Sequence, residues 1–302
     1  MAKIYIGMSG WTYPGWRGDF YPKNLVQKNE LAFASRQVNS IEINGTFYSL
    51  QKPESFQKWH DETPEDFCFS VKAPQYITHI RRLKDVKEPL ANFMASGLLC
   101  LGEKMGPLLW QFPPNVMLKD DRFEKFLKML PHDAKSAAKL AKQHSSRVDG
   151  RNFIKALGDF PVRHAFEFRH PSFKNPDFLK LLKKHNVAVV FAHSGEKSPY
   201  MEDLTADFIY ARMHGQEAKY KKGYTSEIIA WLADRVETWT EGRQPKDAEV
   251  TLLEKPKVIK RDAFIYFDTE IKEYAPSDAR HLAQRLGIKM TKHSKIAFGR
   301  TA

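Results

Sequence analysis

The sequence predicts an α/β fold, a single-domain TIM-type (β/α)8 barrel, and three observations support this prediction. Eight short runs of apolar, β-branched or aromatic residues recur along the chain. Segments with helical periodicity lie between most of these runs, so that strand and helix alternate. The length of 302 residues also suits such a barrel, which takes about 250 residues plus insertions.

The predicted strands are the eight apolar runs. They span residues 4–9, 40–46, 67–73, 106–112, 164–169, 187–193, 208–213 and 263–268. The stretch between the sixth and seventh strands is short and leaves room for only one short helix, around Met201.

The predicted helices lie between the strands. They span residues 24–37, 53–60, 85–101, 122–130, 177–185, 226–240 and 277–286. Pro53 stands at a helix start, where its missing N–H costs little. Asp85, with Glu88 three residues later, has the pattern of a capping box. Gly102 is then the expected end of that helix.

The competing architecture is a doubly wound sheet, which usually carries a glycine-rich phosphate loop after its first strand. Here the chain after the first strand reads SGWTYPGWRGDFYP, with aromatic side chains where a phosphate would need bare backbone. We therefore favour the barrel, as a single domain over residues 1–302. Its core is expected at about 4–287 and is followed by a basic tail at 288–302.

The composition is that of a globular protein, with 42% hydrophobic and 28% charged residues, which excludes disorder over the whole chain. No apolar run reaches the roughly 18 residues that a membrane helix needs, and the first residues enter a strand pattern without a signal peptide. We therefore expect a cytoplasmic protein with no membrane partner. Cys68 and Cys100 stand alone in apolar runs and predict buried side chains rather than a disulfide or a zinc site.

The formal net charge of +12 favours anionic partners. Part of this excess is local, because Lys135, Lys139 and Lys142 have the spacing of one helix face. The tail after residue 288 adds further basic residues and no acidic one. Such runs usually form solvated surface, so we weigh contact with nucleic acid below binding of a small anionic ligand.

Polar side chains gather at the carboxyl ends of the predicted strands, the face that carries the active site in TIM barrels. Side chains alternate along a strand, so isoleucines that face the helices leave Glu42 and Asn44 facing the barrel. The other inward positions fall on Ser70, Lys72, Gln111, Glu167, Arg169, Tyr210, Arg212, His214, Tyr266, Asp268 and either Ala192 or His193. Burying so many charges is costly unless function retains them. We interpret this ring as a ligand site; a salt-bridged layer that plugs the barrel is the structural alternative.

The residue types in this ring suggest how a ligand would be bound and converted. The cations that suit a carboxylate or phosphate are Lys72, Arg169 and Arg212. The predicted acid and base catalysts are Glu42, Glu167 and His214. The remaining predicted substrate-binding residues are Asn44, Gln111, Tyr266 and Asp268, together with Trp11 and Tyr48, whose rings could stack on a ligand.

A metal site is an alternative for the same part of the barrel. Residues of the types that bind zinc or manganese are Glu42, Glu167, His170, His193, His214 and Asp268. No HExxH or comparable motif is present, and three cationic side chains in the ring would oppose a dication. We therefore assign no metal and no cofactor, and keep zinc or manganese as the alternative. The basic loop at 220–224 is a weak phosphate-binding signal.

Seven stretches of the chain form a recognisable combination of motifs. They read IGMSGWTYPGWRGDFYP, VNSIEINGTFYSLQKPESFQKW, FCFSVKAPQYITH, LGEKMGPLLWQFPPN, HAFEFRHPSF, FIYARMHG and IYFDTEIKEYAPSDARHL. In this order, from residue 4 to about 286, they resemble the YecE-like family, known as domain of unknown function family 72. The resemblance implies a TIM-type barrel. Similarity to endonuclease IV and xylose isomerase type barrels has suggested metal-dependent or nucleic-acid chemistry, an analogy of fold that does not determine function.

Carried over position by position, the family's motifs coincide with the predicted ring and its neighbours. They fall on Ser9, Gly10, Trp11, Glu42, Asn44, Thr46, Phe47, Tyr48, Lys72, Gln111, Pro113, Glu167, Arg169, His170, Arg212, His214 and Gly215. Two positions depart from the pattern. Phe173 stands where the family usually has Trp, and Asp268 with Thr269 stands where the eighth strand usually ends in two asparagines. The second change alters the charge of the rim, so a family role at that corner does not transfer.

The sequence thus predicts a barrel that binds a polar, anionic or nucleotide-like small molecule at its C-terminal face. We lean towards an enzyme with hydrolase or isomerase-type chemistry. One alternative is a metal-dependent phosphodiesterase or endonuclease acting on nucleic acid, which bound zinc or manganese and a salt-dependent affinity for DNA or RNA would reveal. The other is a non-catalytic ligand-binding or sensor module, which would hold the ligand without converting it.

Overall fold

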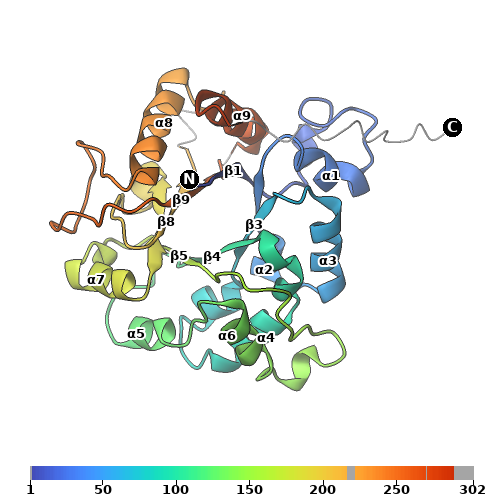
Figure 1. The fold of residues 1–302 in the computed structure, drawn as a ribbon. Helices are drawn as coiled ribbons and strands as arrows, with labels where there is room; N and C mark the ends of the chain where they lie inside the picture. Colours follow the sequence, from blue (N-terminus) through green and yellow to red (C-terminus); the bar gives the residue numbers. More distant parts are fainter. Residues whose placement is uncertain (1, 216–221, 270, 289–302) are drawn as a thin grey trace.

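Nine parallel strands form a single sheet in the computed structural model, which describes residues 2–215, 222–269 and 271–288 (Figure 1). The strands are β1 (Ile4–Ser9), β2 (Ser40–Ile43), β3 (Cys68–Lys72), β4 (Met105–Gln111), β5 (His164–Glu167), β6 (Val187–Val189), β7 (Phe191–His193), β8 (Phe208–Met213) and β9 (Asp262–Phe267). Their order in the sheet is β6-β5-β4-β3-β2-β1-β9-β8-β7. Most neighbours in the sheet are therefore consecutive in the chain.

The sheet closes into a barrel through its two end strands. β6 and β7 are separated only by Val190, whose backbone N–H donates to the carbonyl oxygen of Phe166 in β5 at 2.9 Å. β6 pairs with β5 and β7 pairs with β8, so residues 187–193 act as one strand that joins both edges. Figure 1 shows the resulting ring of strands with helices outside it. The structure thus confirms the predicted TIM-type barrel.

Helices surround the strands in the described part of the chain. They are α1 (Glu30–Ala34), α2 (Gly45–Tyr48), α3 (Pro53–Glu62), α4 (Lys87–Ala95), α5 (Arg122–Leu127), α6 (Ala134–Ala141), α7 (Pro176–Lys184), α8 (Ser226–Thr240) and α9 (Ala275–Arg285). Shorter helical turns span Pro14–Trp16, Gln27–Asn29, Tyr76–Ile80, Leu98–Lys104, Ser146–Val148, Pro171–Phe173, Gly195–Lys197 and Lys272–Tyr274. α8 has the predicted bounds, whereas α1 is much shorter than the helix predicted at 24–37.

The apolar core has one part inside the ring of strands and another outside it. Ala165 and Tyr210 belong to the inner cluster. Ile41, Ile43 and Phe166 belong to the larger outer cluster, which lies between strands and helices. Side chains therefore alternate along the strands as the sequence predicts, with the isoleucines of β2 facing the helices.

The helix predicted at residues 85–101 is shorter and begins later, as α4. Asp85 has a φ of +52° and makes no capping hydrogen bond, so the predicted capping box is wrong. α4 ends at Ala95, before Gly97, which has a φ of +117°. A Cβ at Gly97 would lie 2.6 Å from Cα of Pro53. Because α3 packs so closely against this turn, only glycine fits there.

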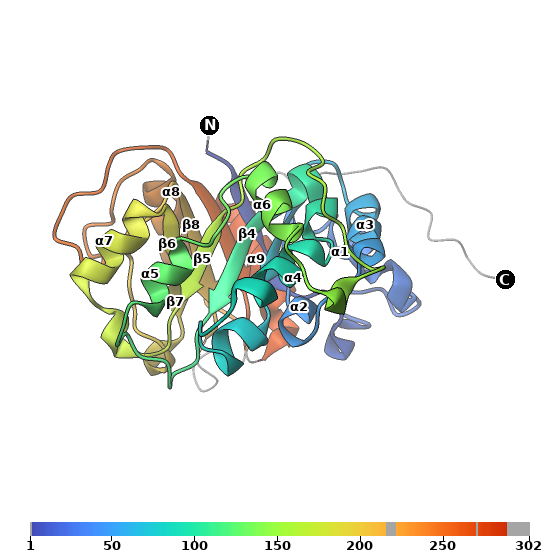
Figure 2. The ribbon, with the colours of Figure 1, turned by 90° about the horizontal axis from the view of Figure 1, so that it is seen from below.

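The second strand also ends earlier than predicted. β2 stops at Ile43, and α2 follows. The N–H of Phe47 donates to the carbonyl oxygen of Asn44 at 3.0 Å. Oγ1 of Thr46 donates to the carbonyl oxygen of Lys72 at 2.7 Å, which ties α2 to the end of β3. In Figure 2, where the N-terminus lies at the top, α2 lies at the lower end of the barrel, where the parallel strands finish.

No α-helix forms around Met201, contrary to the prediction; the described residues between β7 and β8 contain only a short helical turn. The N–H of Glu202 donates instead to the carbonyl oxygen of Glu249 at 2.9 Å. The carboxylate of Asp203 accepts the N–H of Leu252 at 2.7 Å. These bonds to a later loop replace the internal bonds that a helix would make.

The basic segments of the sequence have different outcomes. Lys135 and Lys139 lie exposed on α6, and Lys142 follows at its end, so this face is basic as predicted. The basic tail after residue 288 lies outside the described residues, as do the first two residues of the loop at 220–224. Within the described residues, no helix is long and apolar enough to cross a membrane.

Candidate functional site

Arg212 of β8 lies fully buried at the carboxyl ends of the strands and joins three carboxylates. Its Nε and Nη2 donate to Glu42 of β2 at 3.0 and 2.8 Å. Its Nη1 donates to Glu167 of β5 at 2.6 Å, and its Nη2 to Asp268, which follows β9, at 2.5 Å. Strands from different sides of the ring therefore meet at one guanidinium group.

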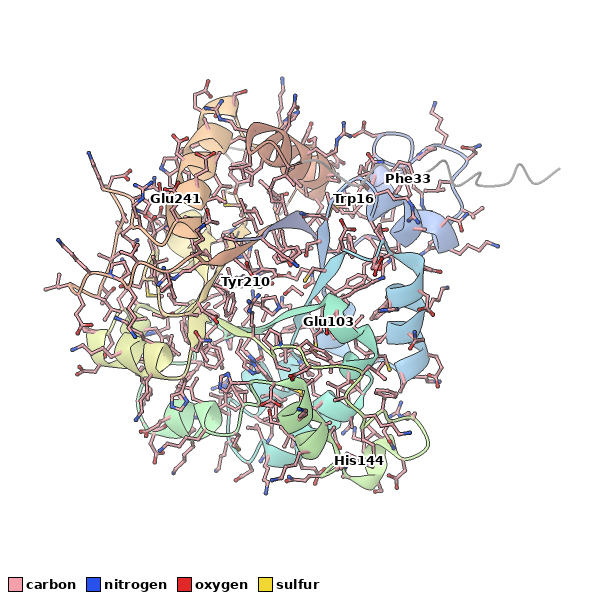
Figure 3. All side chains as sticks on the ribbon, in the orientation of Figure 1. Trp16, Phe33, Glu103, His144, Tyr210 and Glu241 are labelled. Carbon is pink, nitrogen blue, oxygen red and sulfur yellow. The ribbon has the colours of Figure 1, made fainter. Side chains whose placement is uncertain are left out.

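Two hydroxyl groups from neighbouring strands hold the carboxylate of Glu42 in place. Oγ of Ser9 in β1 donates to it at 2.7 Å, and the hydroxyl of Tyr210 in β8 donates at 2.6 Å. The Tyr210 hydroxyl also shares a hydrogen bond with Oγ of Ser70 at 2.6 Å. Figure 3 shows Tyr210 inside the ring of strands. Both carboxylate oxygens of Glu42 are thus used within the protein, which fixes its orientation.

His214 connects the other two carboxylates of this network. Its Nε2 lies 3.1 Å from Oε1 of Glu167, and its Nδ1 lies 3.6 Å from Oδ2 of Asp268. Nε2 of Gln111 donates to both oxygens of Glu167 at 3.1 Å. Glu167 is completely buried, whereas His214 is 8% exposed. The imidazole therefore connects the buried carboxylate of Glu167 to the rim of the barrel.

The charges of the network stabilise one another. Burial alone raises the pKa of Glu167, but Arg212 and then His214 outweigh it and hold that pKa well below its usual range. Burial likewise raises the pKa of Asp268, and Arg212 and His214 reverse the direction and lower it. Burial lowers the pKa of Arg212, yet Glu167 and Glu42 raise it well above its ordinary value. Glu167, Asp268 and Arg212 are therefore ionised at neutral pH.

Tyr266 lies deeper in the barrel than the sequence predicts. It is fully buried, and its hydroxyl shares a hydrogen bond with Oγ of Ser40 at 2.7 Å. Its ring packs against that of Tyr210. Because Tyr266 belongs to the inner apolar cluster below the charged network, it supports the site and does not reach a ligand at the rim.

Arg212 also differs from its predicted role as an anion-binding residue. Its three nitrogen atoms all donate to carboxylates of the protein, so its charge is already neutralised. Lys72, Arg169 and Lys272 are cations that lie around this network and are partly exposed. Nη2 of Arg169 lies 3.5 Å from Oε1 of Glu167, and Nζ of Lys272 lies 3.9 Å from Asp268.

A cleft of about 310 Å³ opens beside the charged network. It is lined by Ser9, Gly10, Trp11, Thr12, Tyr13, Trp16, Ile43, Asn44, Gly45, Gln51, Trp59 and Lys272. Ser9 and Lys272 also contact carboxylates of the network, so the cleft and the network share two side chains. Oδ1 of Asn44 is buried without a hydrogen-bond partner in the described structure and is available to a ligand.

Trp11 and Tyr48, the aromatic residues predicted to stack on a ligand, line different cavities in the structure. Trp11 lines the cleft, edge to face with Trp59 of α3 at 5.3 Å between ring centroids. Tyr48 is 74% exposed and lines a different cavity of about 240 Å³, together with Tyr76 and Arg147. The cleft beside the network therefore contains Trp11 but not Tyr48.

Three residues of this site were given no role in it by the sequence analysis. Ser9 has the inward parity of β1, a signal that the strand pattern contained. Lys272 stands four residues after Asp268, which is the spacing of neighbours on a helical turn. Trp59 comes from the middle of α3, and nothing in its local sequence places it in a cleft.

The histidines considered as metal ligands do not converge. His193 points outside the barrel, where its ring lies 5.7 Å from the rings of Tyr224 and Trp231. Nδ1 of His170 accepts the N–H of Ser172 at 3.1 Å. Among residues 2–215, 222–269 and 271–288, no three His, Cys, Asp or Glu side chains form a group that could hold a metal ion. The guanidinium of Arg212 lies between the carboxylates and would repel a dication, so the residues present do not fit zinc or manganese.

Comparisons with known proteins relate the chain to one family. A family model described as "Protein of unknown function DUF72" matches residues 5–299. The UPF0759 protein YunF of Bacillus subtilis is 28% identical over 196 residues, which cover 63% of this chain and 59% of YunF. The UPF0759 protein YecE of Escherichia coli K12 is 31% identical over 110 residues, which cover 36% of this chain and 38% of YecE. Both matches thus span less than two thirds of the relative's length.

Solved structures share the fold over almost the full chain. A DUF72 family protein of Thermotoga maritima has a TM-score of 0.68 at 22% identity, covering 94% of this chain and 99% of that one. A DUF72 family protein of Enterococcus faecalis has a TM-score of 0.62 at 15% identity, covering 96% and 99%. Likeness at these identities shows the fold alone. Because the family model extends from the first strand to beyond α9, the last helix of the described residues, the chain belongs to the DUF72 family of proteins of unknown function.

Proposed function

We propose that the protein is an enzyme that binds a small anionic ligand, bearing a phosphate or carboxylate group, at the C-terminal face of the barrel. The main support is the cleft of about 310 Å³, which shares Ser9 and Lys272 with the buried charged network. Active sites of TIM barrels lie at this face. A concave site beside ionisable groups with shifted pKa values is also where ligands and catalysis are most often found.

The surroundings of the cleft suit an anion attached to a larger polar or planar group. Lys272 and Arg169 have partly exposed side chains, at 39% and 31%, and remain able to attract the anion. Trp11 and Trp59 offer ring surface for the rest of the ligand. Asn44 adds an unpaired acceptor that would bind a ligand hydroxyl or amino group.

His214 is the proton-transfer group of this proposal. It lies between the carboxylates of Glu167 and Asp268, which orient the imidazole. Glu167 remains ionised and acts as a positioning residue. Glu42, whose oxygens already accept bonds from neighbouring side chains, holds Arg212 in place rather than exchanging a proton. Proton transfer of this kind serves isomerase or hydrolase chemistry without a metal.

Native mass spectrometry of the untagged protein and thermal unfolding with a panel of phosphorylated and carboxylated metabolites test this proposal. We expect some of these anions to raise Tm and to be converted by the wild-type protein. His214→Gln should keep the Tm shift and lose turnover, whereas His193→Gln, outside the barrel, should keep both. A ligand that binds to both proteins and is never converted would favour a sensor module. No Tm shift with any anion would contradict the binding site itself.

A further inference from the structure

Lys72 is a side chain at the rim that the proton-transfer proposal does not use. It ends β3 on the inward parity, and its side chain is partly buried. Its Nζ lies 4.4 Å from the centroid of the Phe47 ring. Among the described residues, no carboxylate lies within ion-pair distance of this Nζ and no group accepts a hydrogen bond from it.

Lys104 provides the contrast within the same chain. Its Nζ donates to the carbonyl oxygens of His60 and Thr63 at 2.5 and 2.9 Å and to Oγ1 of Thr63 at 3.3 Å. All three ammonium protons therefore have acceptors at the end of α3. Lys104 is thus a structural lysine, whereas the amine of Lys72 is not committed to the fold.

The groups around Lys72 favour its neutral form. Burial is the largest cause that lowers the pKa of Lys72, and Arg212 lowers it further. Glu42, Asp268 and Glu167 act in the opposite direction, but their charges are shared with Arg212. The face of the Phe47 ring attracts an ammonium and so acts in the same direction as these carboxylates.

The pKa of His79 is also lowered by nearby cations. Burial, Lys72 and then Arg169 lower the pKa of His79 to about 4, so its imidazole is neutral at pH 7. Its ring packs edge to face on Phe47 at 5.0 Å. Lys72 therefore lies near Arg212 and against the aromatic ring of Phe47, with a neutral imidazole nearby. A lysine that is desolvated and next to another cation is the type that acts as an amine nucleophile.

We propose that Lys72 forms a Schiff base with the carbonyl carbon of a small anionic aldehyde or ketone. The Nζ lone pair attacks the carbonyl carbon, and the carbonyl oxygen takes up a proton to give a carbinolamine. The C–O bond then breaks with uptake of a second proton, water leaves, and the protons lost from nitrogen balance those taken up by oxygen. No oxidant or reductant is needed. This inference rests on the proposed function for the anionic part of the ligand and names its reactive group.

Reductive methylation with limiting formaldehyde and cyanoborohydride at pH 7 tests the amine without a choice of substrate. Each unit by which the pKa falls raises the neutral fraction about tenfold. We therefore expect peptide mapping to find Lys72 methylated faster than Lys58, although the side chain of Lys58 is 60% exposed. Lys104, whose ammonium is fully bonded, should react slowest. If Lys72 reacts no faster than Lys104, the proposal is overturned.

Trapping with carbonyl compounds tests the covalent step. The wild-type protein, Lys72→Arg and Lys58→Arg are each incubated with pyruvate or glyceraldehyde 3-phosphate and reduced with borohydride. We expect one adduct per chain, mapped to Lys72, in the wild type and in Lys58→Arg, and none in Lys72→Arg, whose folding is checked by its Tm. If anions of the metabolite panel still raise Tm but no adduct forms at Lys72, the Schiff base is refuted and the proposed function stands. If neither occurs, both proposals fail.

Discussion

The two ends of the barrel each contain an arginine inside the ring of strands, but its surroundings differ. At the N-terminal end, Arg163 pairs with the single carboxylate of Asp262 at 2.9 Å. Its guanidinium carbon lies 5.6 and 5.8 Å from the ring centroids of Phe208 and Phe264, so aromatic side chains cover it. At the C-terminal end, Arg212 is fully buried and joins carboxylates from three different strand ends.

This difference suggests that the arginine at the N-terminal end has a structural role, whereas the arginine at the C-terminal end belongs to a functional site. At the N-terminal end, Arg163 has one carboxylate partner, and two aromatic rings cover its guanidinium. At the C-terminal end, three carboxylates surround the central guanidinium, and the side chains of Lys72, Arg169 and Lys272 lie at the rim and are partly accessible. Buried charges of this number contribute little net stability compared with apolar packing. Their concentration at the face used for catalysis in such barrels therefore supports a functional origin.

Replacing each arginine by methionine should give the largest difference between the two ends. Arg212→Met leaves three carboxylates without their shared partner, and we expect a loss of about 3–5 kcal/mol in the free energy of unfolding. Arg163→Met removes a pair whose side chains are each 22% exposed, and we expect a loss of about 1 kcal/mol. Urea denaturation at pH 7 measures both. Equal losses would show that the two arginines play the same structural role.

Glu167→Gln tests the C-terminal end through the pH dependence of the free energy of unfolding. The pKa of Glu167 is lower in the fold than in the unfolded chain, so its ionisation stabilises the protein above the unfolded pKa of about 4.3. This stabilisation disappears as the pH falls through the lower folded pKa. We expect the variant to lose about 2 kcal/mol at pH 7 and to unfold less steeply with acid below about pH 4.3. Urea titrations between pH 7 and pH 3 measure this; an unchanged acid slope would contradict the ionised Glu167.

His164, at the opposite end of the same strand β5, should respond in a different pH range. Nε1 of Trp110 donates to its Nδ1 at 3.0 Å, so its Nε2 carries the proton and donates to the carbonyl oxygen of Pro131 at 2.7 Å. Burial lowers the pKa of His164 to about 3, well below the unfolded value of about 6.5. The stability that the neutral ring contributes is complete above about pH 6.5 and is lost as the pH falls towards about 3.

His164→Gln therefore tests whether the N-terminal half of β5 is held by a neutral group. We expect a loss of about 1 kcal/mol at pH 7, because the amide replaces the ring's hydrogen bonds imperfectly. The fall in stability between about pH 6.5 and pH 4.5 should flatten, whereas Glu167→Gln should change only the lower range. The same urea titrations distinguish the two variants. A changed slope above about pH 4.5 in Glu167→Gln would mean that the two ends of β5 are not electrostatically distinct.

Much of the barrel and of the charged ring could be predicted from the sequence because strands alternate side chains with a period of two. This period placed Glu42, Glu167 and Arg212 on the inward face before any contact was known. It also contained Ser9, whose parity was not used. The end of β2 could not be predicted, because α2 depends on the bond from Thr46 to a carbonyl oxygen on β3, a contact between distant residues.

The ion pairs of Arg212 within the ring could not be predicted from the sequence for a related reason. Strand parity states that Arg212 points inward, but only closure of the barrel brings β2 and β5 opposite β8, so that carboxylates neutralise it. The depth of Tyr266 in the barrel depends on the stagger between strands. Tyr266 is the register partner of Arg212 in the pairing of β8 with β9, yet its hydroxyl group bonds to Ser40 at the start of β2. Residue types thus identified the region of the site, and three-dimensional register decided which of its cations remain accessible.

Lys272→Ala should have the smallest effect on stability and a clear effect on binding. Its ion pair with Asp268 is long, at 3.9 Å, and its side chain is 39% exposed, so we expect the free energy of unfolding to change by less than about 0.5 kcal/mol. Lys58→Ala is a matched control, because Lys58 pairs with Glu62 at the same i,i+4 spacing at 3.7 Å but lies outside the cleft of about 310 Å³. For an anion identified by thermal unfolding, titration calorimetry should give about a tenfold higher Kd for Lys272→Ala, equivalent to about 1.4 kcal/mol, and no change for Lys58→Ala. Equal affinities in both variants would place the anion elsewhere and remove the reason for surplus cations at this end of the barrel.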